Sequence, residues 1–177
     1  DLTGADKARL EAINRALSDE TSTFAQNVVD STAGWSWVVE DEARLAGLPA
    51  SAVAAVRAEA ERRGLAGYCF TLAVPCYQAV MAHADDAGVR ETLYRAYNRR
   101  ATTPPHDNLP HVRRILALRQ EKAHLLGFGQ YADFVLADRM AGTGARAQAF
   151  VLDLQARTRA AYQAEIDSPC ELVDFWR

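Results

Sequence analysis

The chain has 177 residues, of which 49% are hydrophobic and 24% charged, and its formal net charge is −3. This length corresponds to one domain or part of a larger one, and the composition is that of an ordinary globular protein. The slight acidity and the scattered basic residues create no positive field, so we expect no nucleic-acid partner. No apolar run approaches the ~20 residues that a membrane span requires, so we expect no membrane partner.

The cysteines and the first residues indicate a compartment. Cys69, Cys76 and Cys170 are odd in number and form no C-x-x-C pair, which is typical of reduced thiols in a cytoplasmic protein. The opening DLTGADKARL also lacks the apolar core of a secretory signal. The sequence therefore predicts a cytoplasmic location.

The first predicted element is a long helix that runs from Thr3 to about Ser31. Thr3 can cap its first turn, and Asp6 lies three residues later near the positive end of the helix dipole. An apolar seam then recurs at helical spacing over several turns. Its members are Leu10, Ile13, Leu17, Phe24 and Val28.

Two short segments have the features of β-strands. At 35–39, WSWVV, the apolar period changes toward two, and 68–74, YCFTLAV, is rich in aromatic and β-branched residues. The sequence predicts that they pair as a two-stranded ribbon. Because two short strands alone are only marginally stable, we expect the ribbon to lean on helix side chains through Trp37 and Phe70.

Most of the remaining chain has the period of helices, which are separated by glycines, prolines and acidic caps. The sequence predicts a mostly α fold of about seven or eight helices with one short ribbon. The further helices are expected in DEARLAGLP, at 51–63, from Pro75 to Ala84, from Asp85 or Asp86 to Tyr97, at 109–126, from Tyr131 and from Thr143. The predicted apolar faces include Val112, Ile115, Leu116, Ala123 and Leu126 in one helix and Phe150, Leu154 and Ala161 in the last.

The motif GFGQYA, at 127–132, fits the dinucleotide fingerprint G-x-G-x-x-G/A. That fingerprint requires a strand before its first glycine and a helix after its last. Here a predicted helix precedes Gly127, and no acidic residue on a strand about 20 residues downstream completes the site. We interpret the motif as a corner between two helices, in which Gly127 has a positive φ and a new helix starts at Tyr131.

The four histidines do not form a zinc-binding pattern. A zinc protease needs two histidines four residues apart on a helix with a glutamate beside the first, whereas His106 and His111 are five apart across a proline. Glu121 and His124 stand three apart, as in one half-site of a di-iron bundle, but the second half-site and two further glutamates are missing. We interpret these residues as surface polar groups.

Cys76 follows Pro75 at a predicted helix start, where the helix dipole can lower the pKa of a thiol. A catalytic cysteine also needs a histidine, and His83, seven residues later, lies two turns away. A packed, inert thiol is therefore the favoured interpretation.

Acidic clusters occur at Asp85-Asp86 and at Glu40-Asp41-Glu42, and both are better explained as helix starts than as metal sites. Glu61-Arg62-Arg63 is interpreted as a solvated face. From the residues alone we assign no catalytic, cofactor-binding or metal-binding residue.

Several motifs follow one another in a specific order along residues 9 to 165. They are Leu17-Ser18 with Phe24, Asn27 and Val28; LAGLP at 45–49; YCFTL at 68–72 with Pro75-Cys76-Tyr77; Arg90-Glu91 with Tyr94, Ala96 and Arg99-Arg100; Asp107-Asn108 with Ile115, Leu118-Arg119, Glu121, Ala123-His124-Leu125-Leu126-Gly127 and Tyr131-Ala132-Asp133; and Met140-Ala141. In this order they resemble the N-terminal part of the thimet oligopeptidase, oligopeptidase A and peptidyl-dipeptidase family of zinc metallopeptidases. Leu126-Gly127-Phe128 is similar to that family's corner between two packed helices.

The resemblance implies a mostly helical clamshell with a deep channel for short peptides, and zinc bound by His-Glu-x-x-His and a later glutamate. In the family those ligands lie downstream of everything in this sequence, so no catalytic role is transferred to any residue here. Residues 1–167 are expected to be the helical, non-catalytic N-terminal region of a zinc metallo-oligopeptidase, whose catalytic zinc domain is absent from this chain. Residues 168–177, SPCELVDFWR, depart from the family pattern.

Two functions remain open at this point. In the first, the chain is the channel-wall portion of a protease that hydrolyses short peptides, and by itself neither binds zinc nor cleaves. In the second, it is a stand-alone helical module that binds peptides or a partner protein. A gene that continues into a His-Glu-x-x-His helix would support the first, and a natural stop codon near Arg177 the second.

Overall fold

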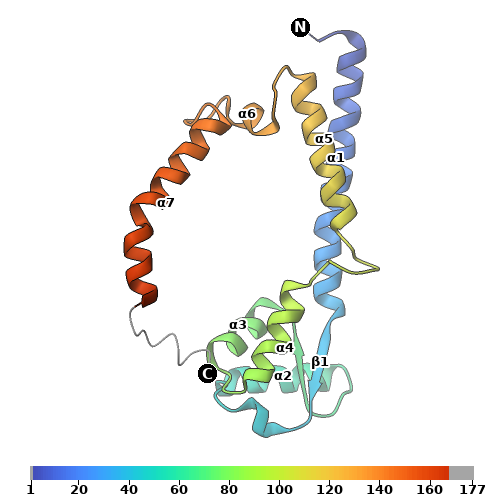
Figure 1. Ribbon diagram of the computed structural model, residues 1–177. Helices are drawn as coiled ribbons and strands as arrows, with labels where there is room; N and C mark the ends of the chain where they lie inside the picture. Colours follow the sequence, from blue (N-terminus) through green and yellow to red (C-terminus); the bar gives the residue numbers. More distant parts are fainter. Residues whose placement is uncertain (1, 168–177) are drawn as a thin grey trace. The chain divides into compact units, whose positions relative to one another are not determined.

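The computed structural model describes residues 2–167; residue 1 and residues 168–177, which were predicted to depart from the family pattern, lie outside the described residues (Figure 1). The described residues form seven α-helices, one 3₁₀ helix and two strands, which confirms the predicted fold class. None of the helices in this part of the chain combines the length and apolar character needed to cross a membrane. The elements are α1 (Gly4–Gly34), β1 (Ser36–Val39), η1 (Glu42–Leu45), α2 (Ala50–Arg62), β2 (Tyr68–Thr71), α3 (Val74–His83), α4 (Ala87–Asn98), α5 (Leu109–Leu125), α6 (Tyr131–Leu136) and α7 (Gly144–Asp167).

The chain divides into two compact units, which are described separately. The central unit comprises Ser22–His111, and the terminal unit comprises Asp1–Thr21 with Val112–Arg177. The long predicted helix is confirmed as α1, which contributes residues to both units. Its start is a capping box, because the Thr3 hydroxyl accepts the Asp6 N–H at 3.2 Å and the Asp6 carboxylate accepts the Thr3 N–H at 3.2 Å.

The predicted ribbon of the central unit is confirmed. β1 and β2 are antiparallel, with Ser36 opposite Thr71 and Trp37 opposite Phe70. The rings of Trp37 and Phe70 lie 5.9 Å apart between their centroids. β2 is shorter than the predicted 68–74, because Ser36 is the first residue of β1 and the chain beyond Thr71 has no strand to pair with.

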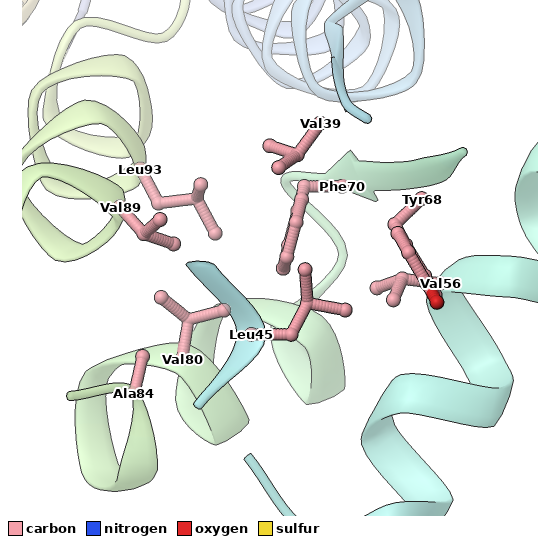
Figure 2. Close-up of a cluster of buried hydrophobic side chains, with 9 residues drawn as sticks. All are labelled: Val39, Leu45, Val56, Tyr68, Phe70, Val80, Ala84, Val89 and Leu93. Carbon is pink, nitrogen blue, oxygen red and sulfur yellow. The ribbon is translucent and has the colours of Figure 1, made fainter. Parts of the chain in front are cut away.

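The core of the central unit gathers side chains from the ribbon, η1 and three helices. Figure 2 shows them pointing into one shared space, with Phe70 reaching into it from β2. Phe70, Val89 and Leu93 are fully buried, and each contributes roughly 1.5–3 kcal/mol relative to an exposed side chain. The complete cluster is Val39, Leu45, Val56, Tyr68, Phe70, Val80, Ala84, Val89 and Leu93.

The LAGLP corner connects η1 to α2 and packs against the end of α3. Gly47 has a φ of +82°, and a Cβ there would overlap the carbonyl oxygen of His83. The Asp85 N–H donates to the carbonyl of Ala46 at 2.9 Å next to this close approach. Glycine is therefore required both for the backbone conformation and for the space.

The acidic clusters of the central unit are helix starts, as predicted. Asp86 is the N-cap of α4 and accepts the N–H groups of Gly88 and Val89 at 2.7 and 3.1 Å. Asp41 is the N-cap of η1 and accepts the Ala43 N–H at 3.0 Å. Each carboxylate satisfies backbone donors that a helix leaves unpaired at its first turn.

In the terminal unit, α5 lies alongside the first part of α1 (Figure 1). Arg9 donates two hydrogen bonds to Glu121, at 2.5 and 2.8 Å, and Lys122 donates to Asn14 at 2.7 Å. The buried residues at this packing are Ile13, Ile115, Leu118 and Ala123.

The predicted apolar face of α5 is partly wrong. Ile115 and Ala123 are buried, but Leu116 is 58% exposed, Val112 is exposed, and Leu118 is buried instead. Residue 116 lies about 100° round the helix from residue 115, so the side that is buried depends on where α1 packs. The apolar period alone does not contain that information.

The last helix differs most from its prediction. Thr143 does cap α7, since its hydroxyl accepts the Arg146 N–H at 3.2 Å. However, no residue of α7 is buried, and Phe150, Leu154 and Ala161, which were expected to point inward, are exposed. Their expected covering surface is not among the residues that the structure describes.

Candidate functional site

The central unit contains a groove of about 590 Å³ between α2, β2 and α3. Its lining is mainly apolar, and the LAGLP corner contributes Leu48 and Pro49 to it. Small side chains line both helical walls, with Ala52 and Ala55 from α2 and Ala79 and Ala82 from α3. Because alanine fills little of the space between two helices, the walls leave room for an apolar group.

The carboxylate of Glu59, at the edge of this groove, is held by arginines. Arg62 donates to it at 2.6 and 2.8 Å, and Arg63 donates at 2.6 Å. These hydrogen bonds lower the pKa of Glu59 from 4.5 to about 2. Glu59 is therefore ionised at neutral pH and occupied by its own helix, so it is a poor general base. Of the predicted solvated face, Arg62 and Glu61 are exposed, whereas Arg63 is half-buried.

Cys76 and His83 both line the groove, since α3 runs along it. Burial raises the pKa of the Cys76 thiol, which is the opposite of the helix-dipole effect considered from the sequence. A thiol with a raised pKa is protonated at neutral pH and is a weak nucleophile. The groove can therefore bind an apolar group, and neither Glu59 nor the Cys76 thiol is activated for proton transfer or nucleophilic attack.

The two residues of the E-x-x-H pattern are both engaged elsewhere. The hydrogen bonds from Arg9 lower the pKa of Glu121 and hold its carboxylate against α1. His124 Nε2 lies 2.6 Å from Gln120 Nε2 and 3.2 Å from the carbonyl oxygen of Gly129, within the corner. The pair thus serves helix packing and the turn.

The histidines are spread along the chain: His83 lies in α3, His106 in the loop before α5, and His111 and His124 at the two ends of α5. Within residues 2–167, no group of three or more histidine, cysteine, aspartate or glutamate side chains could hold a metal ion. The described residues do not fit the zinc that the family resemblance implies.

Two structural features of the motif residues were missed by the sequence analysis. Asn27 donates to the buried Asn108 at 2.9 Å, and Asn108 donates to the carbonyl of Phe24 at 3.0 Å. An asparagine in the apolar seam of a helix was the available signal, because a buried amide needs partners.

The second missed feature is an aromatic stack between α3 and α4. The rings of Tyr77 and Tyr97 lie 3.9 Å apart, and the Arg100 guanidinium lies 3.5 Å from the centre of the Tyr97 ring. Tyr77 and Arg100 belong to the motifs that carry the family resemblance. In this structure, these motif residues hold elements together.

The family assignment rests on the comparison with known proteins. The model of peptidase family M3 matches residues 80–173, which is more than half of the chain. The chain belongs to peptidase family M3. The predicted resemblance to the N-terminal part of these peptidases is therefore confirmed.

Relatives from this family cover nearly all of the chain. Oligopeptidase A of Salmonella typhimurium and oligopeptidase A of Escherichia coli are each 42% identical to it over 163 residues, which is 89% of this chain and 24% of each relative. Dipeptidyl carboxypeptidase of Escherichia coli is 30% identical over 175 residues, 98% of this chain and 26% of the relative. The chain thus spans about a quarter of the length of these family M3 proteins.

Proposed function

We propose that this chain is the N-terminal, non-catalytic portion of a zinc metallo-oligopeptidase, a cytoplasmic hydrolase of short peptides, and that it forms one wall of the substrate channel. The observation that carries the proposal is the 42% identity to oligopeptidase A over 89% of the chain, in proteins about four times as long. We assign residues 1–167 to the helical region of this portion; the departure of 168–177 from the family pattern remains a prediction, since the family match runs through residue 173.

The chemistry of the described residues supports the proposal that this chain forms a wall of the substrate channel. The groove of the central unit has small apolar walls, the Glu59 carboxylate is paired with two arginines, and the Cys76 thiol is protonated. Such a surface can contact and exclude chains by shape, and neither Glu59 nor Cys76 is suited to act as a base or a nucleophile. We assign no zinc ligand to this chain and place the metal in the downstream portion.

Three preparations test this proposal: residues 1–177 alone, the same chain with the downstream portion added in trans, and a single chain that contains both portions. We call this single chain the uninterrupted peptidase. A quenched fluorescent peptide is the substrate, with and without a chelator, and bound zinc is measured in each. We expect no turnover by residues 1–177 and chelator-sensitive turnover once the downstream portion is present. Chelator-sensitive turnover by residues 1–177 alone would refute the non-catalytic assignment.

The groove itself favours a second candidate, a stand-alone module that binds peptides or a partner protein. An apolar hollow of about 590 Å³ bordered by alanines is the size of a ligand site. In that case residues 1–177 would bind short apolar peptides by calorimetry, and Ala55→Trp, which fills the groove, would abolish binding. A zinc-loaded uninterrupted protein without peptidase activity would also favour this candidate.

A further inference from the structure

The apolar side chains of α7 have no covering surface among the described residues. Phe150 is 67% exposed and Leu154 is 50% exposed, and Val151 and Tyr162 are similarly open to solvent. None of the residues of this 24-residue helix is buried. An exposed apolar surface of this extent on a folded protein marks an interaction site.

These side chains lie on one face of α7. At 100° per residue, Phe150, Leu154 and Ala161 fall within about 40° of one another, and Val151 and Tyr162 extend the stripe to about 120°. We call these five residues the docking face. Ala147 and Thr158 lie within the same arc, and Glu165 interrupts it at the C-terminal end of the helix.

A charged strip borders the docking face on one side. Arg146, Asp153 and Arg157 lie within about 60° of Phe150, on the side away from Val151, and Arg157 pairs with Asp153 at 2.9 Å. The side opposite the docking face presents alanines together with Leu152, Arg159 and Gln163. Four of the six exposed large apolar side chains of α7 lie on the docking face, so this is the side that a partner surface would cover.

We propose that the docking face packs against the downstream portion of the same peptidase chain, an inference that rests on the proposed function. The match to family M3 runs through residue 173, so the whole of α7 belongs to the family fold. The chain accounts for 24% of the length of oligopeptidase A, which leaves about three quarters of such a protein to supply the covering surface. The docking face is thus an intramolecular interface that joins the N-terminal portion to the rest of the enzyme.

A matched pair of leucines gives the test. Leu154 lies on the docking face, and Leu152, 54% exposed, lies about 200° away round the helix, beside Arg159 and Gln163. Leu154→Cys and Leu152→Cys are made separately, both in residues 1–177 and in the uninterrupted peptidase. Maleimide labelling is followed by mass spectrometry on the tryptic peptide 147–157, which contains either new thiol and excludes Cys69 and Cys76.

We expect both thiols to label at the same rate in residues 1–177. In the uninterrupted peptidase, Leu154→Cys should label at least about tenfold more slowly, the factor that corresponds to 1.4 kcal/mol, whereas Leu152→Cys should be unchanged. Equal labelling of Leu154→Cys in both proteins would overturn the proposal. Slow labelling of Leu154→Cys already in residues 1–177 would also overturn the proposal. If labelling is slow at every protein concentration, another part of this chain covers residue 154. If it is slow only at high concentration, a second copy of the chain covers it.

Peptidase activity of the uninterrupted protein is measured in parallel, so the two proposals fail separately. Protection of Leu154→Cys without hydrolysis supports the docking face and counts against the proposed activity. Hydrolysis without protection supports the activity and overturns the docking face.

Discussion

Gly127→Val tests the corner between α5 and α6. Gly127 has a φ of +84°, and its N–H donates to the carbonyl of His124 at 3.0 Å. The N–H of Phe128 donates to the carbonyl of Ala123 at 2.9 Å. These two bonds form a Schellman motif, which satisfies carbonyls that the end of α5 would otherwise leave unpaired.

The expected loss of stability in Gly127→Val follows from the backbone conformation of residue 127 alone. A Cβ on Gly127 would meet no heavy atom within 4 Å, so steric overlap with a neighbour adds nothing. The left-handed conformation costs a residue with a Cβ about 1–2 kcal/mol, and a β-branched side chain falls at the upper end. We therefore expect Gly127→Val to lower the free energy of unfolding by at least about 1 kcal/mol, which lowers Tm by roughly 2–4 °C for a chain of this size.

Gly129→Val is the matched control. Gly129 also has open space where a Cβ would lie, but its φ is not positive. Both variants are unfolded with urea and by heating, with far-UV circular dichroism as the signal. Gly129→Val should be close to neutral, because its cost in strain is small and valine restricts the unfolded chain. A neutral Gly127→Val, or an equal loss in the two variants, would refute the argument from φ.

Three further predictions concern the central unit. Phe70→Ala should destabilise it by about 3–5 kcal/mol in urea titrations, because Phe70 is fully buried in the core; a loss below about 1 kcal/mol would contradict the core assignment. Glu59 has a lowered pKa, so its arginine pairs stabilise the fold fully above about pH 4.5 and lose this effect as the pH falls toward about 2; Glu59→Gln should flatten the pH dependence of Tm in that window, and an unchanged pH profile would contradict the pairing. Asn108→Ala should cost about 1–3 kcal/mol of unfolding free energy, since it removes the partner of Asn27, and a wild-type melting curve would show that the amide pair is unimportant.

Local chemistry was sufficient to predict several elements. The change to period two at 35–39 and the aromatic content of 68–74 predicted the ribbon, and the structure pairs Trp37 with Phe70. Thr3, Thr143 and either Asp85 or Asp86 were predicted at helix starts, and the structure shows Thr3, Asp86 and Thr143 accepting N–H groups of the adjacent turn.

Features that depend on distant residues were not predictable in the same way. The end of β2 at Thr71 depends on where β1 begins, and the burial of Leu118 in place of Leu116 depends on the direction from which α1 packs. Phe150, Leu154 and Ala161 of the docking face were predicted as the inward side of the last helix, but the apolar period could not show that no described residue covers them.

The candidate site was less predictable than the fold. The groove is bordered by alanines, which have no distinctive pattern in an alanine-rich sequence. For Cys76, the sequence offered the helix dipole as one influence on the thiol pKa, whereas in the structure burial has the larger effect and raises it. The spacing of seven positions from Cys76 to His83 indicated separate turns, yet both turns border one groove because it runs along α3.

The amide pair of Asn27 and Asn108 has a consequence for how the loop before α5 is aligned along α1. Apolar side chains such as Phe24 and Val28 recur once per turn, so a slip of one turn, about 5.4 Å, would exchange one apolar contact for a similar one. The same slip would separate both amides from their partners and leave the buried Asn108 side chain without hydrogen bonds. The apolar spacing of α1 is compatible with several alignments of the loop, and the two asparagines favour one of them.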